Sequence, residues 1–372
     1  MLIHAPSASS GSLIRLLDSL KKADFFSSAI PRLTIELPHV VNDETKRYLE
    51  NFRWPPKSDT RTGSLLSLHH RIPQRGLSPE ENSIRFLETF WPADPLSSHI
   101  LVLSPQAELS PLFFHYLKYN ILEYRFSANR FDAENLLGIS LDIPATFLDD
   151  KTAFVAPLIN SSDSGDAPKV SPFLWQAPNS NAALIFGDKW VELHDFVSQS
   201  LSSQHLLPTP ATLNEKVVSK SHPSWLEHVL KLARARGYLT LYPNFENPDA
   251  LATTHNEVYQ SPEEYSDELD DEASGTVLTA DPAQHKSLDK SEQPLAMKSL
   301  LKILPFKGVL PKISEIPVLT WNGEVTSIID VLDSADDYAR TFRREIGGCK
   351  ESAVEKSQVA LMAGDLFCMD NR

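Results

Sequence analysis

The first 145 residues alternate between strand-like and helix-like segments, and this alternation leaves few folds open to the chain. Short apolar runs at residues 2–4, 33–37, 65–72 and 99–103 have the length and composition of strands. Between them lie segments with leucines or aromatic residues at helical spacing, of which residues 12–23 are the clearest. Strands that alternate with helices imply a mostly parallel sheet with helices on both faces. The sequence therefore predicts an α/β fold.

Helix start and stop signals support this prediction. Ser78 is followed directly by Pro and, three residues on, by Glu, which predicts a capping box. Ser110 precedes another Pro and opens a second helix. Ser224 stands three residues before Glu227, which fits a further capping box, and Gly237 is placed to end that helix.

The pattern continues beyond residue 172 with weaker signals. Strands are expected at residues 182–186 and 238–242, and a helix from residue 188 to about 201. Residues 300–332 resemble short strands interrupted by prolines, and one helix is expected around residues 336–344.

Residues 261–294 contain ten acidic and two basic side chains, a net charge of −8 within a chain whose total is −14. Few apolar side chains accompany these charges, so the stretch buries too little surface to offset the entropy of ordering it. We predict a disordered acidic insertion here. The alternative is a segment that binds cations or a partner.

Composition narrows the function classes. The chain has 35 Lys and Arg against 49 Asp and Glu, which argues against nucleic acid as a partner and against docking on anionic lipid. No apolar run is long enough to span a membrane. Two cysteines exclude a disulfide-rich scaffold and a Cys-based zinc cluster. The glycine-rich dinucleotide motif, the phosphate-binding loop, the nucleophile elbow and the zinc-protease histidine motif do not occur.

Two strings and the order of the segments point to a family. They are Pro-Gln-Ala-Glu-Leu-Ser-Pro-Leu-Phe-Phe-His-Tyr at residues 105–116 and Trp-Gln-Ala-Pro-Asn-Ser-Asn-Ala-Ala-Leu at residues 175–184. With them, the chain from about residue 2 to 368 resembles the fungal proteins named glycosyltransferase 2, within the superfamily of glycosyltransferases that have the GT-A fold. The resemblance implies a GT-A-like domain that transfers a sugar from a nucleotide-sugar donor to a hydroxyl acceptor, with inversion.

The resemblance also divides the chain. Residues 1–145 would form the half that binds the nucleotide sugar, and residues 146–260 the acceptor and catalytic half of the same domain. Residues 261–294 would be the variable acidic insertion. Residues 295–372 would add short strands and a helix packed on the domain. Whether the acceptor is a glycan, a lipid or a protein stays open.

Several residues are implied to contact the donor. Most of them follow strands of the first half, whereas His255 follows the segment at residues 242–245 and could reach the diphosphate. The turn after the first strand and the ends of the later strands supply polar or backbone groups, and two arginines would neutralise the diphosphate. The candidates are Ala5, Pro6, Ser7, Glu36, Arg71, Arg75, Ser104, Gln106, Glu108 and His255. For Glu36, Glu108 and His255 the alternative is an ordinary structural or surface role.

One departure from the superfamily pattern affects the chemistry. Where such enzymes usually have Asp-x-Asp, this chain has Ser104-Pro-Gln106, and Asp-x-Asp occurs nowhere in it. Those carboxylates normally hold a divalent cation, Mn²⁺ or Mg²⁺, against the diphosphate. Two hypotheses stay open: transfer without a metal, or a catalytically silent GT-A-like domain that acts as a binding or scaffold module. Asp149-Asp150 is another acidic pair, in a loop without supporting context.

The acceptor side is implied by position. Glu227 would be the general base that takes the proton of the acceptor hydroxyl, although the capping box is an alternative role for it. Trp175 and Asn179 would offer an aromatic platform and hydrogen bonds to an acceptor sugar, and a core position is the alternative for Trp175.

The resemblance implies a secretory-pathway location, such as the Golgi lumen. The chain begins on a strand-like run, which suggests that it is the C-terminal part of a longer protein whose membrane anchor lies upstream; a complete chain would instead be cytoplasmic. Asn160-Ser-Ser is a glycosylation sequon that agrees weakly with the luminal location. In that compartment Cys349 and Cys368 could form a disulfide.

Overall fold

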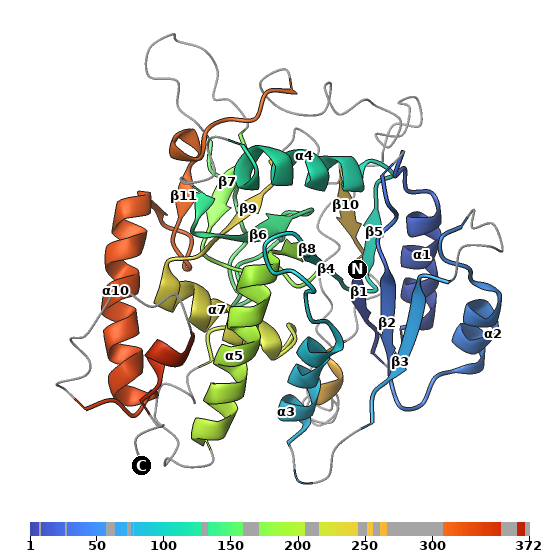
Figure 1. Cartoon of the computed structure of the whole chain (residues 1–372), viewed down its shortest axis with the longest axis horizontal. Helices are drawn as coiled ribbons and strands as arrows, with labels where there is room; N and C mark the ends of the chain where they lie inside the picture. Colours follow the sequence, from blue (N-terminus) through green and yellow to red (C-terminus); the bar gives the residue numbers. More distant parts are fainter. Residues whose placement is uncertain are drawn as a thin grey trace.

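The computed structural model describes most of the chain and is built around one ten-stranded sheet (Figure 1). The sheet order is β12-β11-β7-β9-β6-β8-β4-β1-β2-β3, and β5 and β10 form a separate pair. The residues that the structure describes are 1–6, 9–26, 28–56, 64–72, 76, 78–127, 133–158, 171–204, 216–244, 251–255, 261–265, 308–350 and 363–368.

Four parallel strands form one side of the sheet. They are β1 (Leu2–His4), β2 (Leu33–Leu37), β3 (Leu66–His70) and β4 (Ile100–Leu103). Their connections contain α1 (Ser10–Lys21), α2 (Asp43–Asn51), α3 (Pro79–Ile84) and η1 (Arg85–Thr89). The strand–helix alternation of the first 145 residues therefore produces the parallel arrangement that it predicts.

The other side of the sheet is mixed. Strand β8 is antiparallel to both β4 and β6, which makes β6 run in the same direction as β4. Pairs β6–β9 and β7–β11 are parallel, whereas β7–β9 and β11–β12 are antiparallel. The strands are β6 (Leu136–Ser140), β7 (Phe173–Trp175), β8 (Ala182–Ile185), β9 (Leu239–Tyr242), β11 (Val318–Leu319) and β12 (Val325–Thr326), and the small pair is β5 (Ala107–Leu109) and β10 (Ala252–Thr254).

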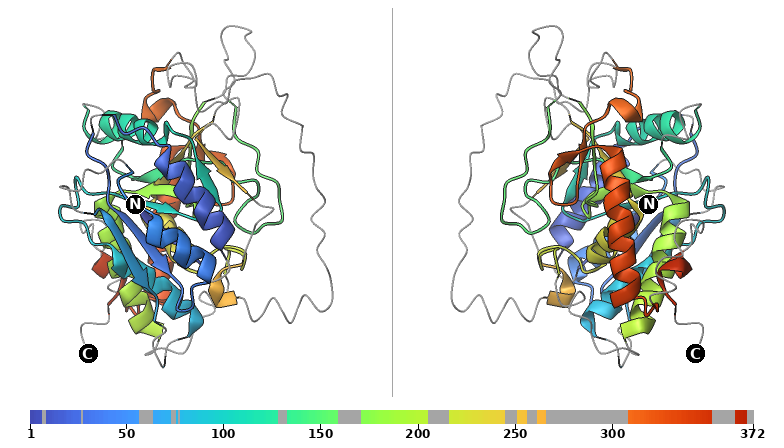
Figure 2. Two further views of the ribbon diagram at one scale, coloured as in Figure 1. Left: turned by 90° about the vertical axis from the view of Figure 1, so that its right-hand side faces the viewer. Right: turned by 90° about the vertical axis from the view of Figure 1, so that its left-hand side faces the viewer.

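Helices cover both faces of the sheet, as the side views in Figure 2 show. Successive side chains of one strand enter opposite cores: Ile3 packs in the core under α1 and α4, and Leu2 in the core under α5 and α7. These are α4 (Phe113–Arg125), α5 (Gly187–Gln204) and α7 (Trp225–Arg236), with η4 (Glu263–Tyr265), η7 (Ile313–Glu315), α10 (Ile328–Glu345) and η8 (Ala363–Leu366) following. The predicted fold class, a mostly parallel α/β sheet flanked by helices, is confirmed.

The helix boundary signals have mixed outcomes. The capping box at Ser78 forms as predicted, and Gly237 ends α7 with a φ of 67°. The capping box at Ser224 is wrong, because its side chain does not cap α7 and the Glu227 carboxylate binds elsewhere. Glu264 accepts the hydrogen bond from the Ser224 amide instead, at 2.9 Å.

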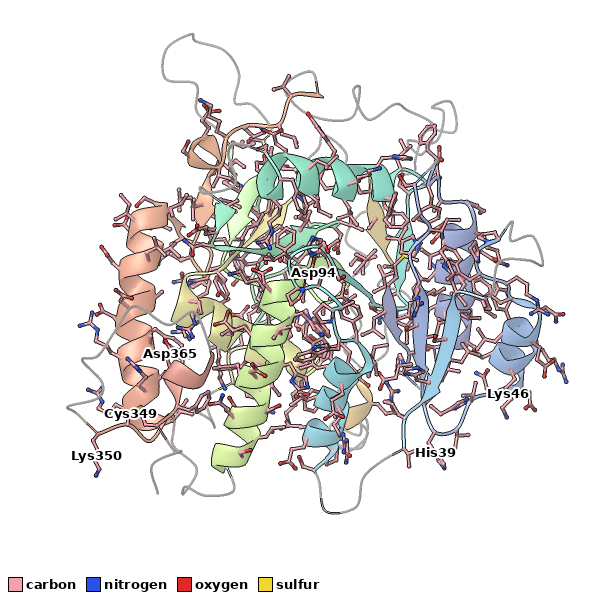
Figure 3. The ribbon with its side chains drawn as sticks, viewed as in Figure 1. His39, Lys46, Asp94, Cys349, Lys350 and Asp365 are labelled. Carbon is pink, nitrogen blue, oxygen red and sulfur yellow. A yellow bond between two sulfur atoms is a disulfide. The ribbon has the colours of Figure 1, made fainter. Side chains whose placement is uncertain are left out.

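The end of the described chain is fastened to the domain. Cys349 and Cys368 form a disulfide, as predicted. Between them, Asp365 binds the guanidinium of Arg236 on α7 at 2.5 Å, and its carbonyl accepts a bond from Arg343. Figure 3 shows Cys349 and Asp365 at this corner of the molecule. The helix expected at residues 336–344 is longer and begins at Ile328, after the N-cap Ser327.

The prediction of disorder from residue 261 is wrong for residues 261–265. Residues 261–265 are packed: the Tyr265 side chain is 3% exposed, and Glu263 and Glu264 make an ion pair and hydrogen bonds. Residues 266–294, the sequon at Asn160 and the strands expected between residues 300 and 307 lie outside the described residues.

Candidate functional site

A crevice of about 710 Å³ opens at the edge of the sheet where β1, β4 and β6 end. These strands run in one direction, so their carboxyl ends share that edge. The chain passes from β1 outward to β2 and β3 and then returns to the other side of β1 as β4. A reversal of this kind leaves a gap between the two connections, and ligands of open α/β sheets bind in it.

The first wall of the crevice is the turn from β1 into α1. Pro6, Ser9 and Ser12 line it. Ser9 is at the N-cap of α1, but its side chain does not cap the helix; the hydroxyl donates to the Pro6 carbonyl at 2.8 Å. The amino end of a 12-residue helix therefore faces the crevice, with the positive end of its dipole. Such an end favours an anionic group.

Asp142, two residues beyond β6, is at the base of the crevice and is 4% exposed. Its carboxylate accepts hydrogen bonds from Asn179, Asn181 and Thr254, at 2.5, 3.2 and 3.0 Å. Burial raises the pKa of Asp142, and these bonds oppose the shift only in part. The network joins the loops after β6 and β7 to the last residue of β10.

Asp150 and His222 also line the crevice. The imidazole Nε2 is 3.4 Å from Asp150 Oδ1, and the hydroxyls of Ser219 and Ser221 both donate to Oδ2. Burial alone would raise the pKa of Asp150, but the bonds from His222 and the two serines outweigh it and lower that pKa. Asp150 is a non-glycine residue at a φ of 56°, in the left-handed region. An ionised carboxylate thus lies beside an imidazole in the crevice.

A second cavity, of about 910 Å³, adjoins the first and shares His4 and Glu263 with it. It lies beyond the carboxyl ends of β1, β2 and β3. Glu36 and Arg71 line it, and Glu36 Oε2 is 2.6 Å from His4 Nδ1. The two cavities therefore meet where β1 ends.

The predicted donor residues divide among these places. Pro6, Ser104 and Gln106 line the first cavity, and Glu36 and Arg71 the second. The Ala5 carbonyl accepts a hydrogen bond from Arg71 at 2.7 Å. Ser7 and Arg75 lie outside the described residues.

Glu108 and His255 come together, but away from the crevice. Strands β5 and β10 pair antiparallel, and this brings His255 Nε2 to 2.8 Å from Glu108 Oε2. Neither residue is among the described residues that line either cavity. Their neighbour Thr254 does line the first cavity, so the pair supports a wall of the site.

Glu227 is 5% exposed and lies behind the crevice wall. Its Oε2 accepts hydrogen bonds from the amides of Val217 and Val218, at 3.2 and 2.9 Å. Lys231, one turn along α7, lies 3.4 Å from Oε1. The carboxylate is therefore occupied by the segment that precedes α7. Its role as general base stays a prediction that the geometry does not favour.

Trp175 and Asn179 have different positions. The Trp175 ring is fully buried in the core, where its Nε1 donates to the Thr320 carbonyl, so it has no face on which a sugar could stack. Asn179 is one layer behind the crevice, where it binds Asp142 and Ser140. It thus orients a lining residue.

The residues at the end of β4 do not form a site for Mn²⁺ or Mg²⁺. Ser104 and Gln106 are neutral there, and the carboxylate nearest in sequence, Glu108, binds His255. Within the part of the chain that the structure describes, no three His, Cys, Asp or Glu side chains are grouped to hold a metal ion. Hard divalent cations prefer several carboxylate or carbonyl oxygens.

Sequence reasoning missed Asp142 and His222. Asp142 follows a buried strand, and a polar residue at that position is a usable signal for the carboxyl edge of a sheet. His222 precedes α7 by three residues and has no local signature. Asp150 was visible only as half of an acidic pair, because its partners come from residues 219–222.

Comparison with known proteins finds no matching family model and no matching curated protein. None of the helices in the described ranges combines the length and apolar character needed to cross a bilayer.

Proposed function

We propose that this protein binds a nucleotide sugar in the crevice and transfers the sugar to a hydroxyl acceptor. The observation that supports it best is the position of the crevice, between the carboxyl ends of β1 and β4 and against the amino end of α1. This is where α/β sheets bind nucleotides and where a helix favours a diphosphate. The sequence resemblance to GT-A-like glycosyltransferases adds the reaction type.

The two cavities suit the two ends of such a donor. The diphosphate and sugar would occupy the first cavity, beside Ser9, Ser104 and Gln106, and the nucleoside the second, near Glu36. Backbone amides of α1 and neutral side chains would bind the phosphate oxygens. This arrangement supports the metal-independent hypothesis for the transfer.

His222 is the proton acceptor that the crevice offers, in place of Glu227. In the proposed reaction the acceptor O–H gives its proton to His222 while the oxygen bonds to the anomeric carbon of the donor sugar. The bond from that carbon to the diphosphate oxygen breaks, and the nucleoside diphosphate leaves with the electron pair. Asp150 is a positioning residue, because its ionised carboxylate holds the ring and stabilises the imidazolium.

The secretory-pathway location remains part of the proposal. The disulfide Cys349–Cys368 supports it, since such bonds persist mainly in oxidising compartments. The acceptor could then be a glycan, a lipid or a protein.

A thermal-shift screen tests the proposal. Uridine, guanosine and cytidine nucleotide sugars are added to the purified chain, with and without manganese. A donor present at 100 times its dissociation constant should add about 2.7 kcal/mol of stability. The same screen on Ser12→Trp, which fills the first cavity, is the control and should lose the shift. If no nucleotide sugar shifts the wild type, the proposal is wrong.

The second candidate is a catalytically silent GT-A-like domain that binds without transfer. The neutral Ser104-Pro-Gln106 at the end of β4 favours it. Donor binding without release of nucleoside diphosphate would support this candidate.

A further inference from the structure

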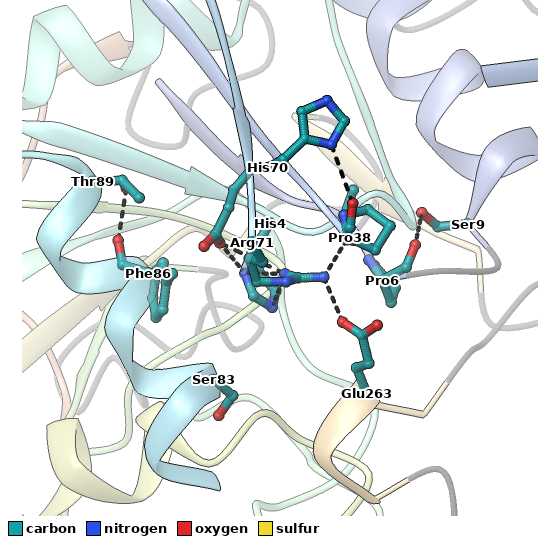
Figure 4. Close-up of polar contacts among 12 residues, drawn as sticks. His4, Pro6, Ser9, Pro38, His70, Arg71, Ser83, Phe86, Thr89 and Glu263 are labelled. Atoms are coloured by element: carbon teal, nitrogen blue, oxygen red, sulfur yellow. Dashed lines mark hydrogen bonds and ion pairs between the residues drawn. The ribbon is translucent and has the colours of Figure 1, made fainter. Parts of the chain in front are cut away.

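Arg71 is the centre of a charged cluster at the junction of the two cavities (Figure 4). Its guanidinium donates to the Ala5 carbonyl, to the His4 ring and to Glu263, whose Oε2 lies 2.6 Å away. Glu36 Oε2 is 3.6 Å from it. The arginine side chain is 14% exposed and Glu36 is 6% exposed, whereas Glu263 is 40% exposed. Glu263 is thus the partner of Arg71 that a ligand from solvent can replace most readily.

Glu263 belongs to a short segment, residues 261–265, that closes over this junction. It is the first part of the acidic stretch and is separated from Arg71 by 192 positions. Glu264 holds the segment through the amide and hydroxyl of Ser224, at 2.9 and 3.0 Å, and Tyr265 is buried beside Lys216. Glu263 lines both cavities. A ligand that spans them must pass this carboxylate.

The charges at the junction disfavour an incoming anion while Glu263 is in place. Arg71 faces two carboxylates, Glu36 and Glu263. The His4 ring lies between them, with Nδ1 2.6 Å from Glu36 Oε2 and both ring nitrogens within 2.9 Å of Arg71 Nη1. The guanidinium and the two carboxylates together carry a net charge of about −1. Removal of Glu263 would leave Arg71 balanced by Glu36 and would vacate the hydrogen bond that Nη2 now donates to Glu263 Oε2.

We infer that Glu263 occupies the position of a phosphoryl group on Arg71, and that an anionic ligand binds there by displacing residues 261–265. A guanidinium donates to carboxylate and phosphate oxygens alike, so the two compete for the Nη2 group that now binds Glu263. This inference rests on the proposed function, because the diphosphate of the donor is the anion in question. The apparent affinity for the donor is then the intrinsic affinity multiplied by the fraction of molecules in which the segment is displaced.

Pyrophosphate binding, measured by calorimetry, tests the inference without a known donor. Glu263→Gln removes the charge and keeps the shape of the side chain, and should bind pyrophosphate about tenfold more tightly than the wild type. Glu50→Gln, on the exposed side of α2, removes the same charge far from Arg71 and should bind as the wild type does. Arg71→Gln in the Glu263→Gln background should abolish the gain.

Each of the following results in the pyrophosphate experiment would overturn the inference. They are an affinity of Glu263→Gln within twofold of the wild type, an equal gain in Glu50→Gln, and no binding of pyrophosphate to any variant. A gain that survives Arg71→Gln would place the anion elsewhere and also overturn it. The proposed function is judged separately: a nucleotide sugar that binds wild type and Glu263→Gln equally would leave that function standing and this inference refuted.

Discussion

Two aspartates on one loop of the crevice, Asp142 and Asp150, have opposite electrostatic environments. Asp142 is buried among amides and hydroxyls, and desolvation raises its pKa. Asp150 is 35% exposed, and its bonds to His222 and two serines lower its pKa despite burial. The neutral partners of Asp142 satisfy the carboxylate without supplying an opposite charge. The imidazole beside Asp150 can supply one.

The difference predicts a structural role in the site for Asp142 and a chemical role for Asp150. The side-chain hydrogen bonds of Asp142 with Asn179, Asn181 and Thr254 connect separate segments of the chain, and these three partners carry no charge. Asp150 holds a group that can exchange a proton, at the surface of a cavity. Carboxylates whose environments drive their pKa values apart usually divide the work of a site in this way.

The largest expected effect is on the rate of sugar transfer. His222→Gln should lower the rate of nucleoside diphosphate release by about 10²–10⁴, because general-base catalysis contributes that factor. Asp150→Asn should cause a smaller loss, since the imidazole remains but is no longer held by a charge. The measurement is single-turnover release with the donor found in the screen, together with the donor dissociation constant, which should not change.

Glu227→Gln is the matched control for this experiment. Gln can still accept the bond from the Val218 amide, so the fold should be kept. Full activity in Glu227→Gln with loss in His222→Gln would support the crevice pair. The reverse pattern would restore Glu227 as the base and show that the static geometry misleads.

The next largest effect is the loss of stability caused by substitution of Asp142. Asp142→Ala should lower the free energy of unfolding by about 1–3 kcal/mol, because the side-chain donors of Asn179, Asn181 and Thr254 lose their acceptor. Asp142→Asn keeps an acceptor oxygen and removes a buried charge, so it should stay within about 1 kcal/mol of the wild type. Urea unfolding at neutral pH measures both. An alanine variant as stable as the wild type would show that the network contributes nothing.

The smallest effect is the pH dependence of the free energy of unfolding. The contributions of Asp142 and Asp150 to it should have opposite signs. The raised pKa of Asp142 means that its ionisation destabilises the folded state at high pH, and that this cost disappears as the pH falls below the ordinary value of 3.8. The lowered pKa of Asp150 means that its stabilisation is present above 3.8 and is lost as the pH falls further.

Unfolding curves of the wild type, Asp142→Asn and Asp150→Asn are measured between pH 3 and 8. They give the difference in the free energy of unfolding between the wild type and each variant. The stability advantage of the wild type over Asp150→Asn should grow as the pH rises from 3. Relative to Asp142→Asn, the wild type should lose stability over the same rise. If the two differences changed with pH in the same direction, the pKa values of Asp142 and Asp150 would not be shifted in opposite directions.

Local patterns in the sequence located many of the strands and helices, although not α2, β5 or β10. Residues 33–37 and 99–103 contain apolar strands, and Ser78 and Gly237 are a helix start and a helix end in the structure as well. The pairing of Cys349 with Cys368 was expected from the luminal location that the family resemblance implies, and the structure contains it. The Ser224 signal failed because Glu264, from 40 residues away, took the amide that Glu227 was expected to bind.

The sequence by itself determined an α/β sheet, because hydrophobic period and capping chemistry act over a few neighbouring residues. The tertiary structure alone decided which polar groups share a cavity. Asp150 meets His222 across 72 positions, and Arg71 meets Glu263 across 192. No local rule links residues so far apart, since their contact depends on strand order and on which loops end at the same edge. The composition of the site therefore emerged only when the chain was folded.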